Sequence, residues 1–350
     1  MKTASQNLST LDLDNEYLPI GGSADFVNKA LTFAYGDSCP AMAESRVEGV
    51  QTLSGTGGLR VFGEFFYKFG EHKHIYVPDP TWGNHIPIMQ NAGLEVRKYT
   101  YYDVATSSLN FGKLIEDMKE APDGSCFLLH ACAHNPTGMD PTSEQWKEIS
   151  SVMKEKRHLP FFDCAYQGFA SGDAPTDAAA IRMFVADGHN LALVQSFSKN
   201  FGLYGQRVGA LSFVSASKEE AGRVTSQLKI VIRPSYSNPP LHGARIVAHI
   251  LGDESLTKDF VSECEGMASR ITGMRTSLVN SLAEAGSTRD WSHVTTQIGM
   301  FAYSGLTGDQ VDAMREKYSV YCTRDGRISM AGVTTGNVDY LAAAMHDVTK

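Results

Sequence analysis

The chain has 350 residues, of which 42% are hydrophobic and 20% charged, and its formal net charge at pH 7 is -8. A chain of this length can bury a large core and is expected to divide into two domains. The acidic charge argues against a nucleic-acid partner, and no stretch reaches the roughly 18 apolar residues that a membrane span needs.

The first residues contain no recognisable targeting signal. Met1–Asn7 has neither the apolar region of a signal peptide nor the arginines of a transit peptide. The cysteines lack CxxC spacing, which favours reduced thiols in an intracellular compartment. Cys132 and His134 lie close enough in sequence to suggest a metal site, but small residues in a buried strand are the better interpretation. We therefore predict no metal site.

Short apolar runs alternate with longer amphipathic segments over most of the chain. Helical stretches such as Leu59–Phe69 and Ser143–Lys156 lie between expected strands. The expected strands are Gly49–Leu53, His74–Val77, Glu95–Tyr99, Ser125–Ala133, Pro160–Asp163, Leu191–Ser196 and Gly209–Val214. This alternation predicts an α/β fold with a mainly parallel seven-stranded sheet. Ligands in such sheets bind beyond the carboxyl ends of the strands.

From Leu241 to Leu282 the pattern becomes helical. Three short strands are expected after it, over Ile298–Tyr303, Val320–Tyr321 and Arg327–Met330. We place a domain boundary inside the long helix, near Met267. Residues 1–266 then form a large domain, and residues 267–350 form a smaller α+β domain.

The segment Ser54–Arg60 runs from an expected strand into a helix and is rich in glycine. Its backbone can approach a phosphate closely, and the helix N-terminus supplies free N–H groups. A dinucleotide-binding motif fits poorly because Arg60 stands where the third glycine belongs. Taken alone, the segment fits a plain tight turn equally well.

An acid, Asp163, ends an apolar run. Burying an unpaired carboxylate is costly, and the nitrogen of a pyridinium ring would pair with it. Tyr166 and Asn135 could both reach a hydroxyl on such a ring from adjacent strand ends. The alternative for Asp163 is a helix cap for a segment that starts at Cys164.

Lys199 follows an apolar strand, and Arg207 lies eight residues later. A lone lysine is usually a surface charge, with a pKa of about 10.4. Partial burial and neighbouring cations would lower that pKa, so that the amine could attack an aldehyde. Arg207 can form two charge-assisted hydrogen bonds to a phosphate, with Ser196 helping. With Asp163, these residues supply what an enzyme needs to hold pyridoxal phosphate (PLP) on a lysine.

Trp82 lies in a loop at a strand end, where it could stack on a cofactor ring or simply pack in the core. Arg233 and Arg327 are two further candidates, because an arginine side chain can bind a carboxylate through two hydrogen bonds. Two such arginines would suit a substrate with two carboxylates. Taken alone, each is more simply interpreted as a surface charge.

Taken in order, these residues closely resemble the aspartate aminotransferase family, whose fold is PLP-dependent transferase fold type I. The match runs from Glu16 to the C-terminus and includes the sequence motifs His130–Gly138, Asp163–Ala170 and Ser196–Asn200. Thr81–His85 and Arg233–Asn238 resemble the mitochondrial form more than the animal cytosolic one. The resemblance implies the mitochondrial matrix, with the cytoplasm as the alternative.

The resemblance also implies roles around the cofactor. Lys199 would be the Schiff-base lysine and the proton shuttle of the 1,3-transfer. Asp163 would hold the pyridine nitrogen, with His85 behind it. The ring hydroxyl would be bound by Asn135 and Tyr166, and Trp82 would stack on the ring. The phosphate would be held by Gly55, Thr56, Ser196 and Arg207, and by Tyr17 of the partner subunit.

For the substrates, the resemblance implies dicarboxylates. Arg327 would clamp the α-carboxylate, with Trp82 and Asn135 beside it. Arg233 of the partner subunit would take the side-chain carboxylate, with Ser237 nearby. The active site would therefore need a homodimer. The implied reaction transfers an amino group between L-aspartate and 2-oxoglutarate, giving oxaloacetate and L-glutamate.

One departure from the family concerns the start of the chain. Family members begin earlier, with an arm that crosses the dimer and a piece of the small domain. This chain starts about where the large domain starts. We therefore expect a weaker dimer and incomplete closure over the substrate. A truncated, weakly active or inactive relative of the same family is the alternative.

Three other classes compete with a transaminase. The run Ser196–Lys199 fits the S-x-x-K pattern of serine acyl-enzymes, but the S-D-N and K-T-G words of that class are absent. A PLP lyase or decarboxylase on the same fold is opposed by the pair of candidate carboxylate-binding arginines. A non-catalytic dimerising relative is favoured only by the missing N-terminal segment.

Overall fold

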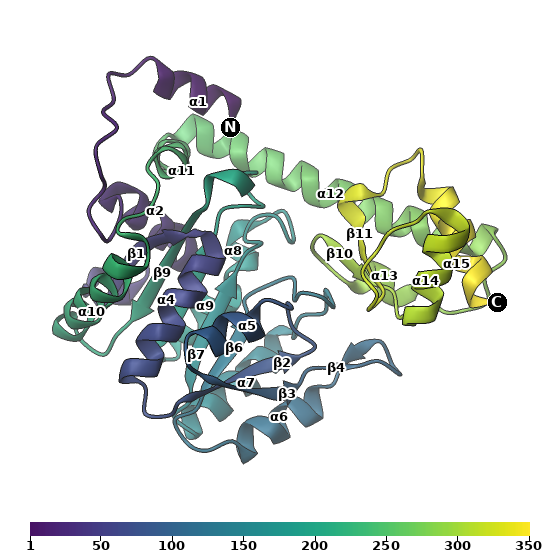
Figure 1. Cartoon of the computed structure of the whole chain (residues 1–350), viewed down its shortest axis with the longest axis horizontal. Coiled ribbons are helices and arrows are strands. Elements are labelled where there is room, and N and C mark those ends of the chain that lie inside the picture. Colours follow the sequence, from purple (N-terminus) through teal and green to yellow (C-terminus); the bar gives the residue numbers. More distant parts are fainter.

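A computed structural model describes all 350 residues (Figure 1). A large body contains a seven-stranded sheet, a smaller body lies at the C-terminal end, and one long helix runs between them. No helix combines the length and the apolar character needed to cross a membrane.

The central sheet has the strand order β1-β9-β8-β7-β6-β2-β3. Neighbouring strands pair in parallel, except that β9 is antiparallel to both of its neighbours. The strands are β1 (Val47–Leu53), β2 (His74–Asp79), β3 (Glu95–Thr100), β6 (Cys126–His130), β7 (Leu159–Cys164), β8 (Leu191–Ser196) and β9 (Val208–Val214). Each corresponds to a strand expected from the sequence, so the mainly parallel α/β fold is confirmed.

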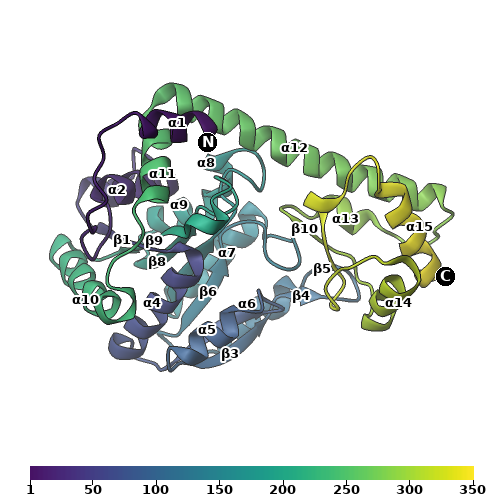
Figure 2. The same cartoon turned by 45° about the horizontal axis from the view of Figure 1, so that its top comes forward.

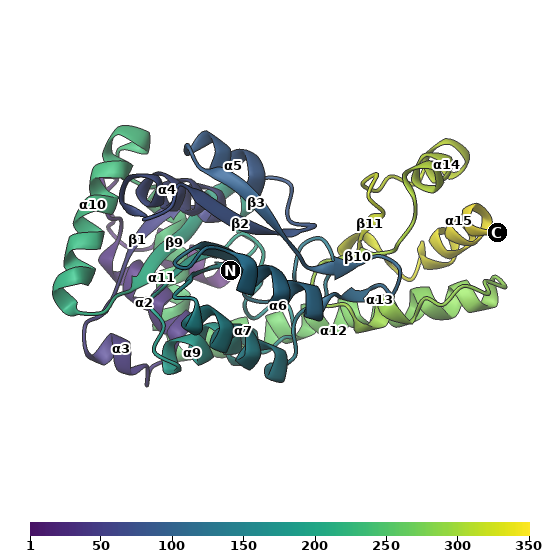
Figure 3. The same cartoon turned by 90° about the horizontal axis from the view of Figure 1, so that it is seen from below.

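Helices cover both faces of this sheet (Figures 2 and 3). One hydrophobic cluster packs α4, α5 and α10 against one face, and a larger cluster packs α2, α6, α7, α9 and α11 against the other. The helices are α2 (Ala24–Tyr35), α3 (Pro40–Ala43), α4 (Ser54–Phe69), α5 (His85–Asn91), α6 (Phe111–Glu120), α7 (Ser143–Glu155), α8 (Ala174–Asp177), α9 (Ala179–Ala186), α10 (Lys218–Tyr236) and α11 (His242–Gly252). Coverage on both faces explains why the central strands are almost wholly apolar.

The smaller body packs around the far half of the long helix α12 (Figure 3). Its core is a separate cluster of 21 buried residues, which also includes Tyr166 and Phe169 from the large body. The elements are α12 (Glu254–Glu284), α13 (Ser292–Thr296), β10 (Phe301–Tyr303), α14 (Gly308–Tyr318), β11 (Arg327–Ser329) and α15 (Val338–Thr349). The domain boundary near Met267, inside α12, stays a prediction.

The sequence-based assignment differs from the structure at several short segments. Val320–Tyr321 is not a strand, because β10 and β11 pair only with each other and leave it no partner. The expected strand to Ala133 stops at His130, since the chain turns and Ala133 takes a φ of 50°. The elements that were not expected include α1 (Lys2–Ser9), β4 (Tyr102–Asp103) and β5 (Ser108–Leu109).

The start of α4 lies unusually close to the sheet because Gly58 has no side chain. A Cβ atom there would lie 2.3 Å from Val194 Cγ2, on β8, and 3.1 Å from Thr52 Oγ1. The contact with Val194 is shorter than any that real Cβ atoms make, so a side chain at this position would push the helix away.

We predict that Gly58→Ala lowers the free energy of unfolding by about 1–3 kcal/mol, because the methyl group overpacks the helix–sheet contact. Gly273→Ala is the matched control, since Gly273 also lies within a helix but has nothing within 4 Å of its would-be Cβ. The control should gain about 0.5–1 kcal/mol. Urea unfolding measures both, and equal effects would show that the close approach is unimportant.

Candidate active site

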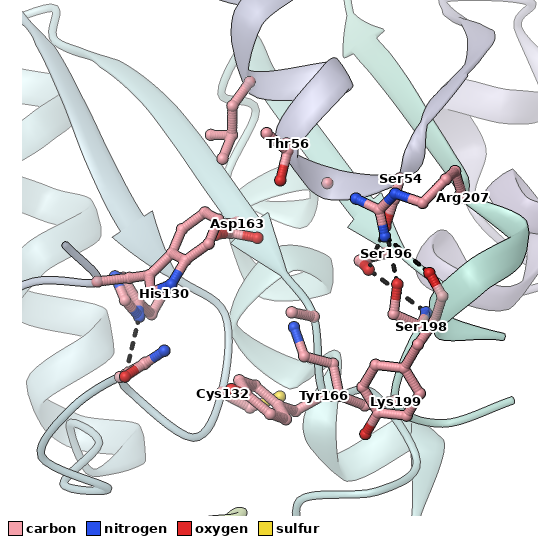
Figure 4. A pocket seen from close by; sticks show the side chains of 16 residues that line it. Ser54, Thr56, His130, Cys132, Asp163, Tyr166, Ser196, Ser198, Lys199 and Arg207 are labelled. Atoms are coloured by element: carbon pink, nitrogen blue, oxygen red, sulfur yellow. Dashed lines mark hydrogen bonds between the residues drawn. The ribbon is translucent and has the colours of Figure 1, made fainter. Parts of the chain in front are cut away.

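A cavity of about 180 Å³ opens at the carboxyl ends of β6, β7 and β8 (Figure 4). Parallel pairing brings these ends to one edge, with His130 opposite Asp163 and Cys164 opposite Gln195. The predicted site residues that line the cavity are Gly55, Thr56, Trp82, Asn135, Asp163, Tyr166, Ser196, Lys199 and Arg207. Widely separated segments of the sequence therefore meet in one place.

One end of the cavity is a cluster of hydroxyl groups. Ser54 Oγ lies 2.9 Å from both Ser196 Oγ and Ser198 Oγ. Helix α4 begins at Ser54 with no side-chain cap, so the N–H groups of its first turn are free to bind an anion. Arg207 adds a cation at the same end (Figure 4). These donors form a cradle for a phosphate.

Gly55 lets the backbone lie close to Ser196 in this cradle, since its would-be Cβ would make a tight contact of 3.3 Å with Ser196 Cβ. Two of the hydroxyls, on Ser54 and Ser198, were not predicted from the sequence. Both residues directly precede predicted ones, Gly55 and Lys199. Their position beside those residues was the signal that could have found them.

The opposite end of the cavity holds the acid. Asp163 Oδ2 lies 2.9 Å from His85 Nε2, and His85 Nδ1 lies 2.7 Å from Thr81 Oγ1. In the tautomer that carries its proton on Nε2, His85 donates to Asp163 and accepts from the Thr81 hydroxyl at Nδ1. Burial alone would raise the pKa of Asp163, but this hydrogen bond and the nearby histidines and Lys199 lower it overall. Asp163 is therefore held as a carboxylate.

The alternative role of Asp163 as a helix cap is wrong, because the chain stays in strand β7 through Cys164 and no helix starts there. Trp82 is partly exposed and lines the cavity, with its ring 5.2 Å from that of His85 at an interplanar angle of 89°. The position of Trp82 beside the acid leaves an indole face available to a flat ligand.

Two further histidines lie behind the acid. Burial, followed by the proximity of His85, lowers the pKa of His130 to about 3. Burial also lowers the pKa of His134 well below its usual value. His130 Nδ1 accepts a hydrogen bond of 3.1 Å from the backbone N–H of Asn135. Both rings are neutral and orient polar groups.

Lys199 lies between the two ends, with its Nζ 5.0 Å from the centroid of the Tyr166 ring. Burial lowers the pKa of Lys199, and the cation of Arg207 adds to this effect, while Asp163 opposes it. More of the amine is therefore unprotonated, as a nucleophile requires. Burial raises the pKa of Tyr166, so its hydroxyl keeps its proton and can donate it in a hydrogen bond.

Arg327, from the smaller body, does not line the cavity but binds Asn135, which does. Arg327 Nη1 donates a hydrogen bond of 2.9 Å to Asn135 Oδ1, and its guanidinium lies 4.3 Å from the centroid of the Phe301 ring. Arg327 thus connects the two bodies at a residue of the cavity wall. Its role in binding a carboxylate stays a prediction.

Besides Arg327, three predicted site residues lie outside the cavity of a single chain: Tyr17, Arg233 and Ser237. Tyr17 is 81% exposed, and Arg233 is exposed near the end of α10. Arg233 Nη1 donates a hydrogen bond of 2.6 Å to Ser237 Oγ. One copy of the chain therefore does not bring Tyr17, Arg233 or Ser237 to the site.

The donor set of the cavity fits PLP. Hydroxyls, free N–H groups and an arginine match a phosphate, and a buried carboxylate matches a pyridinium nitrogen. Tyr166 and Asn135 match a ring hydroxyl, and Lys199 matches the aldehyde carbon. The fold and the site together define a PLP-dependent enzyme of fold type I.

Comparisons with known proteins agree with this class. Residues 1–345 match the family model described as aminotransferase class I and II. The chain is 55% identical over 350 residues to the mitochondrial aspartate aminotransferase of Dictyostelium discoideum, covering 100% of this chain and 82% of that protein. It is 54% identical over 331 residues to the cytoplasmic enzyme of Oryza sativa subsp. japonica, covering 95% and 81%. The chain belongs to the class I and II aminotransferases.

Solved structures with the same fold include the mitochondrial aspartate aminotransferase of Trypanosoma brucei. That structure has a TM-score of 0.97 and 46% identity, covering 99% of this chain and 91% of the other. The aromatic-amino-acid aminotransferase of Burkholderia pseudomallei, covalently bound to pyridoxal phosphate, has a TM-score of 0.97 and 43% identity, covering 100% and 87%.

The anion cradle generates a prediction that needs no cofactor. Cofactor-free protein should bind inorganic phosphate, and Arg207→Met should weaken that binding about tenfold, or about 1.4 kcal/mol, by removing a charge-assisted donor. Arg223→Met, on the exposed side of α10, is the control and should bind like the unmodified protein. Calorimetry measures the affinities. Equal weakening in both variants would reduce the role of Arg207 to general charge.

Proposed function

We propose that this protein is an aspartate aminotransferase, which transfers the amino group between L-aspartate and 2-oxoglutarate to give oxaloacetate and L-glutamate. The observation that carries the proposal is the meeting, in one site, of Lys199, the Asp163–His85 pair and Arg327 bound to Asn135. The aspartate aminotransferases among the relatives support the choice of substrate.

The cofactor of the proposed reaction is PLP. When bound, it supplies an electron-accepting ring for the bond that breaks at the substrate α-carbon. Asp163 would hold the proton on the ring nitrogen, since its carboxylate is kept ionised by His85. Lys199 would carry the cofactor and move a proton at the α-carbon. The phosphate would be bound by Gly55, Thr56, Ser196, Ser198 and Arg207.

The proposed substrates are read by two arginines. Arg327 would bind the α-carboxylate, with Trp82 and Asn135 beside it. Arg233 and Ser237 of the partner subunit would bind the side-chain carboxylate, and Tyr17 of the partner subunit would reach the phosphate. The exposure of Tyr17 and Arg233 in one chain supports a homodimer with shared sites.

The two bodies are proposed to act as domains, residues 1–266 and residues 267–350, with the boundary near Met267. The smaller one carries Arg327, so its approach to the larger one would exclude water from the substrate. For the compartment, the relatives are mitochondrial or cytoplasmic enzymes. We propose the mitochondrial matrix, because the Thr81–His85 and Arg233–Asn238 segments resemble the mitochondrial form. The cytoplasm is the alternative.

The assignment of Lys199 is tested by covalent labelling. Protein incubated with PLP and reduced with borohydride should carry the cofactor on the peptide that contains Lys199, because burial favours the unprotonated amine there. Mass spectrometry locates the label. Lys229→Ala should keep the labelled peptide and Lys199→Ala should lose it. A label on another lysine of the unmodified protein would contradict the assignment.

The dicarboxylate preference is tested at Arg233. Arg233→Asp should lower kcat/KM for aspartate by an amount equal to about 2–5 kcal/mol of lost transition-state stabilisation, if the partner charge is left buried in the dimer. It should lower kcat/KM for alanine or an aromatic amino acid far less. Arg223→Asp, on the same helix, should leave all substrates unchanged. Equal loss for every substrate would remove the side-chain role from Arg233.

Mixing two inactive variants tests whether sites are shared in the same experiment. A hybrid dimer of Lys199→Ala and Arg233→Asp chains contains one site in which both residues are native, if Arg233 acts across the interface. Activity should therefore return on mixing. No recovery, when sedimentation shows that hybrids form, would place Arg233 in its own subunit's site.

A further inference from the structure

Arg275, in the middle of α12, is a buried cation without a carboxylate partner. It is 2% exposed, and no acidic side chain forms an ion pair with it. Burial lowers its pKa to about 10, so the guanidinium is still charged at neutral pH. A buried charge of this kind opposes folding unless its surroundings compensate it.

Three backbone carbonyls supply that compensation. Arg275 Nη1 donates to Val294 O at 3.0 Å, and Nη2 donates to Gly299 O at 2.9 Å and to Phe301 O at 2.6 Å. All three belong to the segment 294–301, which leads from α13 into β10. The planar fork of the guanidinium thus holds a segment that is mostly irregular.

The same segment forms the contact between the two bodies beside the active site. Ile298 N donates to Gly138 O at 2.9 Å, within the loop that carries Asn135. Gly299 lies so close to Ala133 that its would-be Cβ would be 2.6 Å from Ala133 Cβ. The part of the chain held by Arg275 therefore seats the smaller body against the cofactor-binding loop.

The segment also supports Arg327 directly. Phe301, whose carbonyl accepts from Arg275, presents its ring 4.3 Å from the Arg327 guanidinium. β10 and β11 pair so that Tyr303 is opposite Arg327. A shift of the segment would therefore move both the ring beneath Arg327 and the strand that pairs with β11.

We infer that Arg275 is a positioning residue for substrate binding: by fixing the Val294–Phe301 segment, it sets where Arg327 stands relative to Asn135. Arg275 does not contact the substrate itself. This inference rests on the proposed function, in which Arg327 binds the α-carboxylate. According to this inference, Arg275 affects the affinity for the substrate carboxylate and does not affect cofactor binding, although it lies far from Lys199 in the sequence.

The test uses Arg275→Met, which removes the three donors while keeping an apolar stem, and Arg275→Lys, which keeps the charge without the fork. Arg270→Met is the control, because Arg270 lies on the same helix but donates to Val333 O, outside the segment. Hydrogen–deuterium exchange follows residues 294–303. Calorimetry measures the affinity of full-length, PLP-loaded protein for maleate, a dicarboxylate, and that of the cofactor-free protein for inorganic phosphate. Steady-state kinetics with aspartate give KM and kcat.

In Arg275→Met we expect faster exchange over residues 294–303 and a rise in the dissociation constant for maleate and in KM of about tenfold. Phosphate affinity should be unchanged and kcat should fall less than KM rises. Arg275→Lys should lie between this variant and the unmodified protein, and Arg270→Met should behave as unmodified.

Native exchange rates and native KM in Arg275→Met would overturn the inference, as would equal losses of maleate binding, phosphate binding and kcat, which indicate a general structural role. If Arg275→Met does not fold, Arg275→Lys decides by the same comparison. Failure of the unmodified protein to bind maleate or turn over aspartate would instead refute the proposed function. The exchange rates over residues 294–303 would still show whether Arg275 fixes this segment.

Discussion

The site depends on the parallel pairing of β6, β7 and β8, because only strands that run the same way bring their carboxyl ends to one edge. The hydrogen-bonded register places His130 beside Asp163 and Asp163 beside Val194. The residues that follow these strands, Asn135, Tyr166 and Lys199, then line one cavity. The helices on both faces protect this edge from rearrangement, since moving a central strand would expose both cores.

The electrostatics of the edge follow from burial and a small number of hydrogen bonds. Burial lowers the pKa of His130 to about 3 and also lowers that of Lys199. Asp163 keeps its charge, because His85 donates a hydrogen bond to it. The cavity thus separates a stabilised anion from an amine with an increased neutral fraction, and neutral imidazoles lie behind the acid. These are opposite protonation preferences in one small space.

Much of this arrangement was predictable from the sequence, for reasons of local chemistry. Each buried strand is an apolar run, and each candidate residue such as Asp163 or Lys199 interrupts or follows such a run. The hydroxyls of Ser54 and Ser198 were missed because serine is common near turns and its partners are set only by tertiary contact. The two-residue strands β4 and β5 lack enough length for a periodic pattern. Tyr17 and Arg233 were named through the resemblance, and a single chain leaves them on its surface.

The one antiparallel strand of the central sheet, β9, affects how Lys199 can move. Because β9 runs against β8, its beginning lies at the edge where the parallel strands end, and Phe197 N donates to Val208 O at 3.0 Å. The stretch between them is therefore a loop attached at both ends to adjacent strands, and Asn200 Nδ2 holds it further by donating to Gln167 O at 3.0 Å. Lys199 thus has a fixed base and a long, rotatable side chain. The backbone position therefore limits how far the Lys199 amine can reach, and rotations about the side-chain methylene groups account for its movement.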